Sequence, residues 1–126
     1  MIVRLEDLTE EQRCVLLNAV EESYLFSVLM ECAPGQDWPD RMPRIPYLAR
    51  IVEDFMDKGL VTLTKDADEA GQPPIDIPLD QARVIVADPA NWWSSEGGRP
   101  IALAPTDDGL AVYTGHPVTT RDSDHQ

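Results

Sequence analysis

Few residues in this chain could carry out nucleophilic or acid–base chemistry. Its only histidines are His116 and His125, and both fall in a polar C-terminal segment. A serine, cysteine or threonine nucleophile needs a base within hydrogen-bond reach, and a loose segment holds no base in a fixed place. Gly97 and Gly98 do not form either of the glycine patterns that cradle phosphates. We therefore expect no catalytic residues, no cofactor and no enzymatic activity.

The cysteines and the acidic loop residues lack the spacing of a metal site. Cys14 and Cys32 are 18 residues apart, with no CxxC pair and no third cysteine, which argues against a zinc site or a disulfide framework. We expect two buried free thiols, because free cysteine is among the most buried residue types. Asp66, Asp68 and Glu69 alternate as in a calcium loop, but the glycine and the terminal glutamate of such a loop are missing. We expect a solvated acidic loop and no metal ligands.

Tryptophan supplies the candidates for a protein interface. Trp92 and Trp93 are adjacent and precede a glycine-rich stretch, and Trp38 is the only large anchor in a proline-rich loop over residues 36–46. Aromatic anchors dominate protein interfaces, and two neighbouring side chains rarely both fit one core. The alternative is that one or both of Trp92 and Trp93 cover the core.

Length and charge set the broad class of protein. The 126 residues match a single domain, and 43% hydrophobic with 26% charged residues is typical of a globular chain. With 10 Lys and Arg against 23 Asp and Glu, the net charge is −13, which opposes binding to phosphate backbones and anionic lipid. The N-terminus lacks the apolar core of a secretory signal, and no apolar stretch approaches the roughly 20 residues that span a bilayer. We expect a cytoplasmic protein with no membrane partner.

Two amphipathic segments organise the first half of the chain. Thr9 and Gln12 form a capping box that begins a helical segment ending near residue 32, which is one helix or two consecutive helices with a break at residues 21–23. A second helix begins at Pro46 and ends at Gly59. Its apolar stripe has helical spacing, and we expect the face to pack on the first segment: Leu48, Ile51, Val52, Phe55 and Met56.

The second half mixes strands with a long insertion. β-Branched alternation predicts strands at residues 60–64 and 101–104, which we expect to pair antiparallel. We expect residues 65–74 to form a solvated loop, and the pattern of residues 79–87 favours a helix over a strand. We expect one domain over residues 1–114 and a flexible tail over residues 115–126.

The segments 48–61 and 101–110 resemble parts of winged-helix proteins, particularly MarR-like and PadR-like regulators. The first, LARIVEDFMDKGLV, is similar to the third helix and first wing strand of that family. The second, IALAPTDDGL, is similar to the second wing strand and the start of the next helix. The resemblance implies an α+β, mainly helical fold with a two- or three-stranded antiparallel sheet. Here about 36 residues, from Lys65 to Pro100, separate the two wing strands, so the wing carries a long insertion.

The charges on the helix that would read DNA argue against that use. Its exposed side offers Arg50, Glu53, Asp54 and Asp57, a net charge of −2 over these four residues. We therefore expect a non-catalytic, winged-helix-like binding module, a regulatory or adaptor protein acting through a protein partner or self-association. The alternative is a DNA-binding transcriptional regulator of the helix-turn-helix class, whose basic patch would consist of three arginines: Arg41, Arg44 and Arg50.

Overall fold

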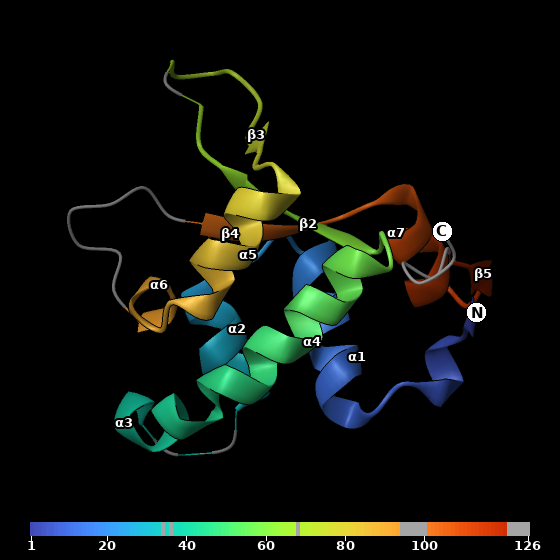
Figure 1. Cartoon of the computed structure of the whole chain (residues 1–126), viewed down its shortest axis with the longest axis horizontal. Coiled ribbons are helices and arrows are strands. Elements are labelled where there is room, and N and C mark those ends of the chain that lie inside the picture. The colour runs from blue at the N-terminus through green and yellow to red at the C-terminus, as the bar shows by residue number, and fades with distance from the viewer. Residues whose placement is uncertain (34, 36, 68, 94–100, 121–126) are drawn as a thin grey trace.

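The protein has an α+β fold in which helices surround a small antiparallel sheet (Figure 1). The computed structural model describes residues 1–33, 35, 37–67, 69–93 and 101–120. Its helices are α1 Glu10–Val20, α2 Leu25–Cys32, α3 Trp38–Arg41, α4 Ile45–Asp57, α5 Leu79–Ala87, α6 Ala90–Trp93 and α7 Asp107–Tyr113, with 3-10 turns at Leu5–Asp7 and Met42–Arg44. Its strands are β1 Ile2–Val3, β2 Val61–Lys65, β3 Ile75–Asp76, β4 Ile101–Pro105 and β5 Val118–Thr119.

The central sheet has the strand order β3-β2-β4, all antiparallel. The predicted pairing of β2 with β4 is confirmed, and its register places Leu63 opposite Leu103. Both of these leucines are fully buried. On its other edge, β4 meets the turn before α2, where Tyr24 forms an isolated bridge with Ala102 and the Leu103 amide donates to the Ser23 carbonyl.

The first helical segment is two helices rather than one. The predicted capping box is present at the start of α1, where Thr9 and Gln12 exchange hydrogen bonds between side chain and backbone. The break follows Val20, and Glu22 there has a positive φ of 55°. This left-handed residue reverses the chain, so that α2 packs against α1 instead of extending it.

Helix α4 supplies the centre of the core. Leu48, Val52 and Phe55 are fully buried and Ile51 is partly buried, as the helical spacing predicts. The helix ends at Asp57, and Gly59, just after the C-cap Lys58, has a φ of 72°, a left-handed conformation that glycine adopts without a steric penalty.

The predicted insertion folds back on the domain. Its helix α5 packs along α4 and against β2, and the short α6 packs on α2 (Figure 1). The preference for a helix over a strand at residues 79–87 is therefore confirmed. Sequence reasoning did not anticipate β3, which lies just beyond the predicted loop at residues 65–74. The predicted loop at residues 36–46 is instead largely helical, because α3 and the second 3-10 turn occupy it.

The two ends of the described chain lie together. Strand β5 pairs antiparallel with β1, and Thr120 is buried while its amide donates to the Met1 carbonyl. Strand β5 lies within the segment that we expected to be a flexible tail, so residues 118–120 are held against the N-terminus. Residues 121–126 of that tail lie outside the described residues.

One tight junction joins the end of α4 to the start of α7. The Thr106 hydroxyl donates to the Gly59 carbonyl at 2.6 Å and accepts from the Gly109 amide at 3.0 Å. The Thr106 amide donates to the Leu60 carbonyl. Gly109 packs directly on that carbonyl, and a β-carbon at this position would overlap the oxygen.

Replacing Gly109 with alanine should therefore destabilise the protein. Alanine favours a helix by up to about 1 kcal/mol over glycine, but the clash with Leu60 forces backbone shifts of the kind that cost about 1–3 kcal/mol or more. We expect a net loss of about 2 kcal/mol in the free energy of unfolding, measured by urea denaturation.

The matched control is Asp108→Ala, one residue earlier on the same helix and exposed. It removes only a favourable charge near the helix N-terminus, so its loss should stay below about 1 kcal/mol. Equal stabilities of Gly109→Ala and Asp108→Ala would contradict the tight junction.

Candidate functional site

The three tryptophans occupy different environments. Trp92 is fully buried, and its indole nitrogen donates to the Val86 carbonyl at 2.9 Å. It therefore covers the core beneath the insertion, which is the alternative that the sequence left open. Trp93 is 38% exposed, so part of its ring is accessible to a partner. Trp38 begins α3, but its side chain lies outside the described part of the structure.

The exposed sides of α4 and α5 form a surface of mixed charged and apolar side chains. We call it the α4–α5 surface and define it by its exposed residues: Tyr47, Arg50, Asp57, Asp80, Arg83 and Val84. An ion pair between Arg83 and Asp57 joins the two helices. Val84 is 72% exposed, the highest fraction among the large hydrophobic residues in the described chain. Beside this surface, Lys58, which follows the last residue of α4, pairs with Asp54 at 2.8 Å.

The three candidate arginines do not offer three free guanidinium groups. One guanidinium nitrogen of Arg44 contacts both carboxylate oxygens of Glu11 at 2.6 Å, and the group stacks over the Tyr47 ring at 4.5 Å. Arg41 is half-buried at the end of α3, and Arg50 is exposed on α4. Phosphate binding by Arg44 would have to displace Glu11.

The cysteines form a disulfide, so the prediction of two free thiols is wrong. Cys14 of α1 and Cys32 at the end of α2 are joined with a Cα–Cα distance of 5.7 Å. In one continuous helix, 18 residues would separate them by about 27 Å, so the reversal at Glu22 is what brings them together. A signal was present in the sequence, since the two cysteines are equally distant from Ser23, at the break between the helices.

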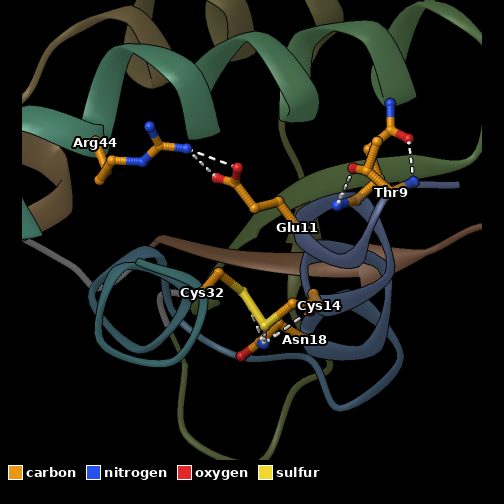
Figure 2. Close-up of a disulfide and its surroundings, with 7 residues drawn as sticks. Thr9, Glu11, Cys14, Asn18, Cys32 and Arg44 are labelled. Atoms are coloured by element: carbon orange, nitrogen blue, oxygen red, sulfur yellow. Dashed lines mark hydrogen bonds and ion pairs between the residues drawn. A yellow bond between two sulfur atoms is a disulfide. The ribbon is translucent and has the colours of Figure 1, made fainter. Parts of the chain in front are cut away.

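The disulfide lines an open cavity of about 360 Å³ on the surface. Around it lie three carboxylates and one guanidinium, from Glu10, Glu11, Glu31 and Arg44. Figure 2 shows the Arg44–Glu11 pair together with the disulfide and with Asn18, whose side chain reaches the sulfur atoms. Sequence reasoning missed this cavity because residues from three separate segments build it.

Asn18 is a fully buried polar side chain behind the disulfide. Its amide nitrogen donates to the Cys14 carbonyl at 2.9 Å and lies 3.5 Å from the Cys32 sulfur. A buried amide is costly unless it is hydrogen-bonded. The contacts of the nitrogen fix the amide next to the sulfur atoms, while the amide oxygen is buried without a hydrogen-bond partner among the described residues.

The described residues show no other grouping suited to catalysis. His116 is exposed after α7, and His125 lies outside the described residues. Within the described ranges, no three His, Cys, Asp or Glu side chains gather as a metal site. A smaller cavity of about 160 Å³ between α4, α5 and β2 has an apolar lining with the hydroxyls of Thr62 and Thr106.

Comparisons with known proteins did not identify a family for this chain. No family model, curated protein or solved structure matches this chain. None of the described helices combines the length and the apolar character needed to cross a membrane.

Removing the disulfide should lower stability measurably. The bond closes a loop of 18 residues, and the chain-entropy model gives about 3 kcal/mol for a loop of that size. We expect the double variant Cys14→Ser, Cys32→Ser to lose about 3 kcal/mol in urea unfolding relative to the oxidised protein.

The reduced wild-type protein is the matched control, because it lacks the bond but keeps both sulfur atoms. It should unfold close to the double variant. If oxidised and reduced proteins unfold at the same urea concentration, the disulfide does not constrain the unfolded chain.

Proposed function

We propose that this chain is a non-catalytic, winged-helix-like binding module that acts as a regulator or adaptor through contacts with another protein. The order of α4, β2, β4 and α7 supports the winged-helix part of the proposal, because it follows the order that the two family-like segments imply. The two segments also contact each other, through the hydrogen bond from Thr106 to Gly59.

The packing of α5 along α4 is the observation that carries the proposal. A helix that reads DNA must present one open, basic or hydrogen-bonding face to the major groove. Here α4 is flanked by α5 on one side, and Arg83 of α5 neutralises Asp57 of α4 rather than a phosphate. The insertion thus restricts access to α4 from one side, while Tyr47, Arg50 and Asp57 of α4 stay exposed.

The charge of the chain indicates the chemistry of the partner. At −13, the protein repels phosphate backbones and also a second acidic copy of itself. The α4–α5 surface itself is balanced in charge, with Asp57 and Asp80 against Arg50 and Arg83, and it also exposes Tyr47 and Val84. The net charge of the chain favours a basic protein partner, and apolar residues of that partner would cover Tyr47 and Val84.

The untagged protein should therefore not bind duplex DNA appreciably at physiological salt. Non-specific affinity comes from counterion release when Lys and Arg neutralise phosphates, and only 10 such residues oppose 23 acids. Fluorescence anisotropy with a labelled duplex at low and moderate salt measures this. Micromolar, salt-sensitive binding would instead support a transcriptional regulator using Arg41, Arg44 and Arg50.

The proposal of a protein partner is tested by affinity capture from the native cell, in which the wild-type protein is compared with a surface variant. Val84→Asp adds a charge at the most exposed large hydrophobic residue of the α4–α5 surface and should reduce capture of the partner at least about tenfold. The matched control is Leu110→Asp on α7, which is 44% exposed and away from this surface. We expect to capture a basic protein with the wild type and with the control, and to lose it with Val84→Asp. Salt should elute this protein. Equal capture by all three would place the interface elsewhere.

A further inference from the structure

We propose that the Cys14–Cys32 disulfide is a thiol-exchange site, at which a small cationic aminothiol enters the adjoining cavity and becomes linked to Cys14. This site adjoins the α4–α5 surface, because Arg44 lines the cavity and stacks on Tyr47. The proposal does not depend on the proposed protein partner.

Access to the sulfur atoms is the first requirement for exchange. Both cysteines line the open cavity of about 360 Å³, a volume several times the roughly 30 Å³ that one water molecule takes up in the liquid. Cys14 is half-buried, whereas Cys32 is only 8% exposed. Thiol attack depends on which sulfur can be reached, so the attacking group meets Cys14 first.

The reaction is a balanced disulfide exchange. The sulfur of the incoming thiolate forms a bond with Cys14 Sγ, while the Cys14–Cys32 bond breaks and its electron pair goes to Cys32 Sγ. That sulfur then takes up a proton and becomes a thiol. The products are a mixed disulfide on Cys14 and free Cys32, and the thiol itself is the only co-reactant.

Asn18 is placed to assist the departure of Cys32. Its amide nitrogen lies 3.5 Å from Cys32 Sγ and is held there by its bond to the Cys14 carbonyl. A donor next to the leaving sulfur stabilises the negative charge that develops on it. Asn18 lies next to both sulfur atoms, since its amide nitrogen is also 3.7 Å from Cys14 Sγ. It is thus a positioning residue for the sulfur pair, and the accessibility of Cys14 decides which sulfur leaves.

The charge of the cavity determines which thiols it favours. Three carboxylates, from Glu10, Glu11 and Glu31, oppose the single guanidinium of Arg44, a net charge of −2. Such a wall repels an anionic thiol and attracts one that carries an ammonium group within a Debye length, about 8 Å at physiological salt. The chemical class that fits is a small aminothiol.

The test uses the oxidised native chain with three thiols of different charge: cysteamine, 2-mercaptoethanol and 2-mercaptoethanesulfonate, at equal thiolate concentrations and low salt. Samples are quenched in acid at early times, alkylated, and cleaved after glutamate, which separates Cys14 from Cys32 at Glu21, Glu22 and Glu31. Mass spectrometry should find the adduct on Cys14 and the alkyl group on Cys32. Cysteamine should react at least about threefold faster than the sulfonate, and the difference should shrink with salt.

The double variant Glu10→Gln, Glu31→Gln should bring the two rates closer together. The matched control is Glu69→Gln, an exposed glutamate in the loop after β2 that does not line the cavity, and it should leave the ratio unchanged. The proposal is overturned if the disulfide exchanges only after unfolding in urea, if the adduct forms on Cys32, or if the rates do not depend on thiol charge.

Discussion

The pairing of β2 with β4 is the constraint on which the rest of the fold depends. These strands are separated by residues 66–100, so the chain must leave the sheet and return to it in register before Leu63 and Leu103 can face each other in the core. Closing a loop of this length carries an entropic cost that local structure alone does not offset. The junction of Thr106 and Gly109 on Gly59 and Leu60 fixes where the returning chain docks, because it joins the end of α4 to the start of α7 by hydrogen bonds.

The insertion between these strands changes the surface of the domain. Its helix α5 uses Ala82 and Val86 to pack into the core, and Trp92 closes that core above Val86 with a buried hydrogen bond. The same packing leaves Val84 in solvent and brings Arg83 to Asp57 on α4. One segment therefore both completes the hydrophobic core and flanks α4, the helix that the winged-helix resemblance would assign to DNA. This double role is one reason why we propose a module that recognises a protein.

The α1–α2 hairpin brings together a second, independent set of groups. Its reversal at Glu22 places Cys14 beside Cys32 and buries Asn18 against both. A buried amide, a disulfide and an open acidic cavity then lie within one hairpin and its neighbour Arg44. Such a cluster couples the chemistry of the sulfur atoms to the connection between two core helices, since the bond is a covalent link between α1 and α2, which also pack against each other.

The sequence by itself determined the elements whose signals are local. The capping box at Thr9, the apolar stripe of α4 that ends before Gly59, and the strands β2 and β4 all follow from spacing and residue type. The features that only the tertiary structure decided depend on contacts between residues far apart in the chain. The disulfide, the burial of Trp92 rather than Trp93, the pairing of β1 with β5 and the engagement of Arg44 by Glu11 are of this kind. Periodicity shows which face of a helix is apolar, but not which other element covers it, because that choice is made by packing across the whole domain.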